Sequence, residues 1–251
     1  MPGTMQCRLH RGALAVLAII LTAAAGSAQA SPVTAVGGYD HYAGPLGQNI
    51  DAVLGAVVLG AGGSDLMLAG VRYDDNLSGQ GITVTGGVGV PLAPMTKLRI
   101  NATRIIADET FRAWRARVGP QLSLPRGTSL SLWYAHYQDH LGGRSNGAIA
   151  EAAAPIVPKL SGRASASYAT TSQGPPAVQG SVGLGWSVVS HLELSGELGL
   201  ARNASGAAGT PGGGGPLGGL PILGGSNGGS SGGTVEQVDT TFLIGLRVTL
   251  P

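Results

Sequence analysis

The chain has 251 residues, of which only 11% are charged and 4% aromatic, whereas 44 are glycine. Soluble domains carry about 25% charged residues, so a conventional solvated surface is not expected. Arg8 and Arg11 fall in a predicted leader; the remainder has thirteen basic and thirteen acidic residues. This balance excludes the basic face that nucleic acid requires, and we expect no nucleic-acid partner.

Residues 1–30 are predicted to be a cleaved signal peptide. Basic residues precede an apolar stretch over 13–25, and Ala28-Gln29-Ala30 has the small-x-small pattern of a cleavage site. The apolar stretch is too short for a membrane-spanning helix, which needs about 20 residues. Cys7, the only cysteine, lies within this leader, so the mature chain has no thiol for disulfides or metal ligation.

Residues 31–251 form alternating segments that predict β-strands with two chemically different faces. In 81–90, for example, Ile82, Val84 and Val88 share one face while Thr83 and Thr85 share the other. Each segment is near the 9–11 residues that a tilted transmembrane strand needs. The predicted strands are 33–42, 50–60, 66–75, 81–91, 96–106, 111–123, 128–138, 147–156, 160–170, 177–188, 191–202 and 236–250.

The connections between these segments alternate in character. Every second one is a tight turn, such as Leu92-Ala93-Pro94-Met95 or Val157-Pro158-Lys159, and most of the others are longer or more polar. Short turns at one end and longer loops at the other are typical of outer-membrane barrels, as is an even number of strands. We therefore predict an all-β fold: a single antiparallel transmembrane β-barrel of about 12 strands.

The last loop, 203–235, is rich in glycine. Gly213, Gly215 and Gly218 match the spacing of a dinucleotide-binding motif, but no strand precedes them and no helix follows. The uncharged composition predicts a flexible loop, with a lid folded into the barrel mouth as the alternative. No cofactor is expected.

Aromatic residues gather near the loop-side ends of the predicted strands. An interfacial girdle of a transmembrane barrel explains this placement. The predicted members are Tyr39, Tyr42, Tyr73, Trp133, Tyr134, Tyr137 and Tyr168.

The hairpins 122–134 and 188–200 and the last strand, 241–250, resemble those of small Gram-negative outer-membrane β-barrel proteins of the porin type. The resemblance is architectural and implies location in the outer membrane, with membrane lipids and the barrel-assembly machinery as partners. In that family the last strand usually ends in an aromatic residue, whereas this chain ends in Pro251.

Charges on a lipid-facing surface cost about 2–4 kcal/mol near the midplane, so the charged strand residues are expected to face the lumen. The candidates are Arg99, Arg115, Arg117, Arg163, Glu151, Glu193, Glu197, Asp239 and Arg247. We expect a narrow passive channel for small solutes, or a structural surface barrel closed by salt bridges. Arg99, Arg115 and Arg117 are expected on one wall, with Glu193, Glu197 and Asp239 roughly across the barrel, giving weak selectivity with at most a slight anion preference.

Two alternatives remain open. An outer-membrane hydrolase would use His136 or His140 beside Asp139 at the rim, but no Gly-x-Ser-x-Gly motif and no second histidine cluster accompanies them. The strand alternation instead places His136 on the lipid side, so neither an enzyme nor a metal site is the favoured interpretation. A soluble periplasmic β-sandwich would also alternate, but with more surface charge.

Overall fold

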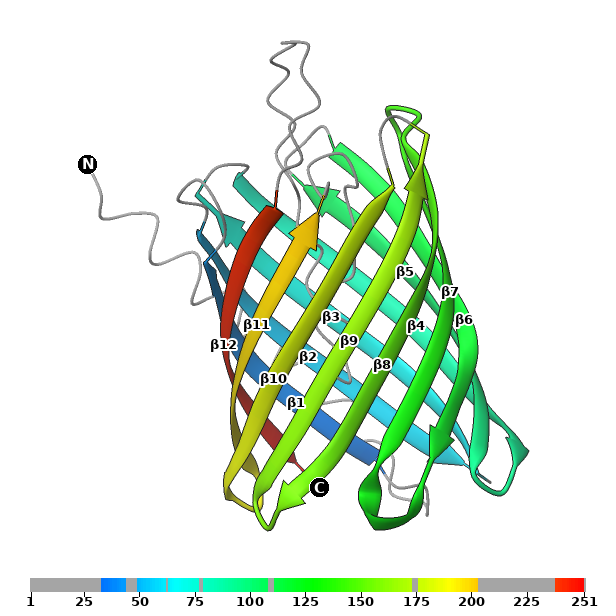
Figure 1. The fold of residues 1–251 in the computed structure, drawn as a ribbon, viewed down its shortest axis with the longest axis vertical. Helices are drawn as coiled ribbons and strands as arrows, with labels where there is room; N and C mark the ends of the chain where they lie inside the picture. The colour runs from blue at the N-terminus through cyan, green and yellow to red at the C-terminus, as the bar shows by residue number, and fades with distance from the viewer. Residues whose placement is uncertain are drawn as a thin grey trace.

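The computed structural model describes residues 33–43, 49–61, 63–76, 79–107, 111–172, 176–202 and 238–250. The predicted signal peptide and the glycine-rich loop 203–235 lie outside these residues. Within them, twelve antiparallel strands form a closed barrel in which each strand pairs with its neighbours in sequence and β1 pairs with β12 (Figure 1). The prediction of a closed, twelve-stranded antiparallel barrel is confirmed.

The strands agree with the predicted segments to within three residues at nearly every boundary. They are β1 Val33–Ala43, β2 Asn49–Ala61, β3 Ser64–Asp75, β4 Gly79–Ala93, β5 Thr96–Ala107, β6 Phe111–Ser123, β7 Ser129–Asp139, β8 Arg144–Val157, β9 Leu160–Thr171, β10 Ala177–Val189, β11 Leu192–Arg202 and β12 Val238–Leu250. A single 3-10 turn, η2 Pro125–Gly127, connects β6 to β7.

The two ends of the barrel differ in their connections. At the lower end in Figure 1, which we call the tight-turn end, β4–β5, β8–β9 and β10–β11 are joined by two residues each. At the opposite end, the loop end, β11 stops at Arg202 and β12 starts only at Val238. The other loop-end connections are short, so connection length separates the two ends less sharply than the sequence suggests.

The alternating residues occupy opposite faces of the sheet, as predicted. In β4 the threonines Thr83 and Thr85 are buried inside the barrel, whereas Ile82 on the outer face is 50% exposed. Most large apolar residues of the other strands also lie on the outer face, which is therefore mainly apolar. The inner wall is mixed, because it carries the charged and hydroxyl groups together with apolar side chains such as Leu54, Met67 and Ile149. The soluble sandwich alternative is wrong, because a single sheet closes on itself instead of two sheets packing face to face.

One part of the β6–β7 ladder departs from regular pairing. Pro120 has no amide hydrogen to donate, and the paired register runs from Val118–Tyr134 to Gln121–Ser131 without the residues between. At the adjacent Gly119, an added Cβ would lie 1.8 Å from the carbonyl oxygen of Leu132. Only glycine permits this close approach of the two backbones.

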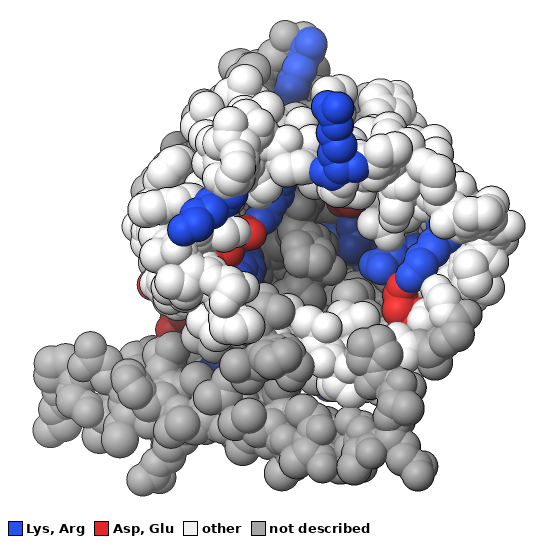
Figure 2. Space-filling model, turned by 90° about the horizontal axis from the view of Figure 1, so that it is seen from below, with Lys and Arg blue, Asp and Glu red and all other residues white. Residues whose placement is uncertain are grey.

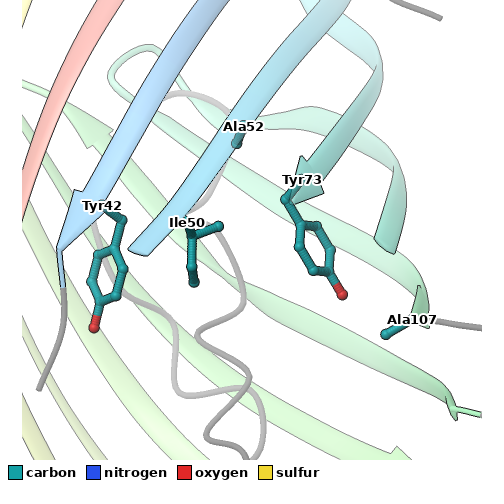
Figure 3. Close-up of a cluster of buried hydrophobic side chains, with 5 residues drawn as sticks. All are labelled: Tyr42, Ile50, Ala52, Tyr73 and Ala107. Atoms are coloured by element: carbon teal, nitrogen blue, oxygen red, sulfur yellow. The ribbon is translucent and has the colours of Figure 1, made fainter. Parts of the chain in front are cut away.

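The interior near the loop end holds clusters of apolar and tyrosine side chains beside the buried carboxylate of Asp75. Tyr42, Ile50, Ala52, Tyr73 and Ala107, from β1, β2, β3 and β5, form a cluster of buried side chains (Figure 3). Ile105, Ala113 and Tyr137 form a second buried cluster on β5, β6 and β7. No helix in the described part of the chain has the length and apolar character needed to cross a membrane.

Candidate functional site

The inner wall is the candidate site, since basic and acidic side chains line the hollow that opens at the tight-turn end (Figure 2). Hydroxyl groups pair across neighbouring strands, with Thr85 and Thr103 Oγ1 atoms 2.9 Å apart and Ser165 and Ser181 Oγ atoms 2.7 Å apart. These small side chains occupy little of the lumen and offer hydrogen-bonding groups to whatever it contains.

Arg115 and Arg117 lie in the middle of β6 and are buried, with only 3% and 4% of their surface exposed. Arg117 Nη1 is 3.8 Å from Glu151 Oε1 on β8, and its guanidinium lies 5.1 Å from the centroid of the Trp133 ring. Trp133 Nε1 in turn donates a hydrogen bond of 2.9 Å to Glu151 Oε2. Glu151 therefore contacts both the Arg117 guanidinium and the Trp133 indole N–H.

Asp65 joins two cations on a strand that is not its neighbour. Lys97 Nζ and Arg99 Nη2, both on β5, lie 2.8 Å and 3.2 Å from Asp65 Oδ2 on β3. The intervening strand β4 places Gly89 in register with both Asp65 and Arg99. A Cβ at Gly89 would lie 2.6 Å from Asp65 Oδ1, so the ion pair passes over a position that has no side chain.

Arg163 and Glu193 repeat this arrangement on the opposite part of the wall. They form an ion pair between β9 and β11, with β10 between them. A Cβ at Gly185 on β10 would lie 2.8 Å from Glu193 Oε1. Here too, glycine on the intervening strand leaves the space through which the pair forms.

The barrel is closed by an ion pair between its first and last strands. Arg247 Nη1 and Nη2 on β12 donate to Asp40 Oδ1 and Oδ2 on β1, at 2.6 Å and 2.8 Å. Such two-point geometry is the strongest form of arginine–carboxylate contact. Gly38 and Gly245 flank the pair, and a Cβ at either position would lie within 3.0 Å of it.

The strands of Arg99, Arg115 and Arg117 do lie across the barrel from β11 and β12, which hold the three predicted acidic residues. The expected separation of charge is nevertheless wrong, because each side also carries charges of the opposite sign. Asp65 lies beside Arg99, Glu151 beside Arg117, Glu193 beside Arg163 and Asp40 beside Arg247. Positive and negative groups thus interleave around the wall.

Glu197 is half-buried on β11 between Gly183 and Leu243. Asp239 lies on the β12 backbone, and its side chain lies outside the described part of the structure.

Three members of this wall were not among the predicted residues. Asp65 directly precedes the predicted strand 66–75, which the structure extends back to Ser64, and Lys97 is the second residue of the predicted strand 96–106. Asp40 alternates with the outward Tyr39 in the predicted strand 33–42, so the alternation places it inward. The inward-facing glycines on neighbouring strands are the sequence signal that could have located these ion pairs.

The predicted aromatic girdle is only partly correct. Tyr39, Tyr134 and Tyr168 are exposed on the outer face, but Tyr42, Tyr73, Trp133 and Tyr137 are buried inside. Because residues an odd number apart on a strand face opposite sides, Tyr39 and Tyr42 could not both have faced the lipid.

A repeated sequence motif occurs in the β1–β2 and β7–β8 hairpins, and its first tyrosine and its histidine lie on the outer face. Tyr39-x-His41-Tyr42 and Tyr134-x-His136-Tyr137 have the same spacing. His41 Nδ1 lies 2.9 Å from Asp51 Oδ1, and His136 Nδ1 lies 2.8 Å from Asn146 Oδ1. The hydroxyl of the preceding tyrosine, Tyr39 or Tyr134, donates to the same oxygen in each case.

The structure does not bring the rim histidines into a catalytic arrangement with Asp139. The carboxylate of Asp139 accepts hydrogen bonds from the backbone amides of Leu141 and Gly143. His136 faces outward beside Asn146, and His140 Nδ1 lies 3.2 Å from the backbone oxygen of Arg112. No group of metal-ligating side chains occurs among the residues that the structure describes.

Comparison with known proteins places this geometry in context. No protein-family model and no curated protein matches the chain. Among solved structures, the KdgM porin matches with a TM-score of 0.60 and 11% identity over 85% of this chain and 98% of the porin. The chain shares the fold of outer-membrane porins. The NanC porin matches with a TM-score of 0.57 and 11% identity over 86% and 99% of the two chains. The COG4313 outer membrane channel from Pseudomonas putida F1 gives 0.55 and 10% over 88% and 96%.

Proposed function

We propose that the mature chain spans the outer membrane as a narrow, passive channel for small solutes. The observation that carries this proposal is the contrast between the two faces of the closed sheet. Outward residues such as Leu68, Val182 and Leu184 are more than half exposed, which suits contact with lipid tails. The inner wall presents hydroxyl and charged groups, which suit a water-filled lumen.

The outward charged side chains of the described strands support this orientation. All of them lie near the loop ends of their strands, namely Asp51, Arg72, Asp74, Arg104, Arg112, Arg144 and Arg202. The cost of a charge on the lipid face falls from about 2–4 kcal/mol at the midplane to about 0–1 kcal/mol near the interface. Their placement therefore fits a membrane whose apolar layer covers the rest of the outer face.

The test is conductance of the purified, refolded protein in planar bilayers under a salt gradient. We expect small, ohmic conductance with weak selectivity, because the charges of the wall are largely paired. A slight anion preference should come from the Arg115–Arg117 wall, and Arg117→Gln should reduce it. A reversal potential near the ideal cation value would contradict the role of these arginines. Absence of conductance from inserted protein would favour a structural surface barrel.

The same arginines suggest which solutes to test first. The KdgM porin has also been solved in complex with disordered oligogalacturonate, an acidic sugar chain. In this chain Arg117 lies against Trp133, which combines a cation with an aromatic surface. We expect an acidic oligosaccharide to interrupt the current more strongly than a neutral one of equal length. Equal effects of the two sugars would argue against an anion-binding wall.

A further inference from the structure

The outer face of β5–β8 carries a concentration of basic and aromatic side chains near the loop end. Arg104, Trp114, Gln138 and Arg144 lie in one lateral row, each in register with the next across the four strands. Arg112 precedes Trp114 on the same face of β6, and the His136 ring lies 5.0 Å from the Trp114 ring. We call Arg104, Arg112, Trp114, His136 and Arg144 the basic–aromatic patch.

The position of the patch matches the boundary of the apolar surface. Toward the tight-turn end, the same faces of β5, β6 and β7 present Ile100, Val118 and Leu132, each 38% or more exposed. Trp and Tyr side chains favour this boundary because their rings are apolar and their N–H or O–H groups remain near water. In a membrane, lipid headgroups lie at this level.

The charge of the patch is of one sign. Three arginines face outward from β5–β8, and no acidic side chain does so among the described residues of these strands. Neither Arg104 nor Arg112 has a side-chain ion pair within the described part of the chain. Exposed guanidinium groups at a headgroup boundary attract anionic lipids and form two-point hydrogen bonds with phosphate.

The repeated motif provides an internal comparison. On β1–β2, Tyr39 and His41 surround the carboxylate of Asp51, and Asp51 is in register with Asp74 on β3. On β7–β8, Tyr134 and His136 surround the neutral amide of Asn146 instead. The two sites share a geometry but differ in charge, and only the second adjoins several outward arginines.

We propose that the basic–aromatic patch binds the phosphate of an anionic lipid headgroup in the membrane leaflet at the loop end. This rests on the proposed membrane-spanning function. Arg104 on β5 and Arg112 on β6 would donate hydrogen bonds to the phosphate, and Arg144 would add to the positive potential around it. Trp114 would pack beside the glycerol or sugar part of the headgroup.

Spin-labelled phosphatidic acid and phosphatidylcholine provide a direct test in vesicles of unlabelled phosphatidylcholine. The fraction of motionally restricted label measures how each lipid associates with the barrel. We expect the wild type to prefer phosphatidic acid, and Arg104→Gln with Arg112→Gln to lower that preference by about fivefold for each arginine removed. Arg72→Gln is the matched control, since Arg72 also faces outward but lies beside Asp74 and bonds to Gln80.

The outcomes separate this proposal from the function on which it rests. A heat-dependent gel shift of the same vesicle samples reports insertion of wild type and variants. An unshifted wild type would contradict the membrane-spanning function itself. A shifted wild type without lipid preference, or an equal loss in Arg72→Gln, would overturn the patch alone. Displacement of the lipid by dilute inorganic phosphate would assign the site to the free anion and overturn a lipid ligand.

Discussion

At the scale of single residues, the ion pairs of the wall depend on glycines that do not themselves interact. Asp65 reaches Arg99 across Gly89, and Glu193 reaches Arg163 across the strand that holds Gly185. A side chain at either glycine would occupy the path between the charges. Glycine normally weakens a strand by roughly 0.5–1 kcal/mol, and at these positions the contacts that it permits offset that cost.

The pair that closes the barrel gives the clearest residue-scale prediction. Arg247→Ala would leave Asp40 buried without its partner, and breaking such a pair costs about 3–5 kcal/mol. We expect a matching loss in free energy of unfolding, measured by urea titration in detergent micelles.

The double variant Asp40→Asn with Arg247→Gln is the control, because it removes both charges and leaves similar volumes. It should recover most of the lost stability. If the double variant is as unstable as Arg247→Ala, the loss in free energy of unfolding comes mainly from removing the arginine's own contacts and not from leaving Asp40 unpaired.

At the scale of elements, strand alternation determines which face each residue occupies, and strand register determines its partners. β6 illustrates both effects. Its inward arginines follow the alternation of the sequence, whereas Pro120 interrupts the ladder with β7 and Gly119 allows the backbones to approach. Trp133, whose ring lies beside the Arg117 guanidinium, directly follows Leu132, whose carbonyl oxygen faces Gly119.

Two identical substitutions in neighbouring parts of the sheet test the importance of this contact. Gly119→Ala places a Cβ against the Leu132 carbonyl oxygen, whereas a Cβ at Gly86 would meet nothing within 4 Å. We expect Gly119→Ala to destabilise the barrel by about 1–3 kcal/mol and Gly86→Ala to have little effect. Unfolding midpoints measured side by side would decide, and equal midpoints would contradict the close approach.

At the scale of the whole molecule, every strand edge is paired, since β1 meets β12. Closure removes the exposed edges at which other β-sheets aggregate and satisfies the backbone groups that lipid cannot. The barrel therefore combines an apolar exterior with a complete ladder of hydrogen bonds, as an inserted protein requires.

This completeness predicts that the folded barrel resists SDS. Unheated samples should migrate differently from boiled ones on a gel, because the closed ladder unfolds only on heating. The protein should also partition with the outer-membrane fraction of cells. Identical migration with recovery from the soluble periplasm would contradict a membrane-spanning barrel.

Much of the architecture was predictable because alternation is a local property. The twelve strands, their faces and the closed sheet required only period-two patterns and the turns between them. The predicted strand 66–75 begins two residues after the observed start of β3 at Ser64, because Gly62 and Gly63 indicate a turn there, and this difference excludes Asp65 from the predicted strand.

The partners within the wall were not predictable in the same way. Arg163 and Glu193 are thirty residues apart and lie on strands that are not neighbours. Their contact depends on the register of three strands and on the curvature of the barrel. The expected opposite walls followed from strand order alone, which gives the angular position of a residue but neither its height nor the reach of its side chain.

The clamp between Asp40 and Arg247 also has a consequence for the order of folding. These residues are 207 apart in sequence, so their contact closes a loop that contains all ten strands from β2 to β11. Contacts of such long range are slow to form, because chain entropy must be lost before they can stabilise anything. Hairpins should therefore form early and the seam last. Weakening the Asp40–Arg247 ion pair should increase the unfolding rate much more than it slows hairpin formation. The contact between β1 and β12 is therefore where a folded barrel would first open.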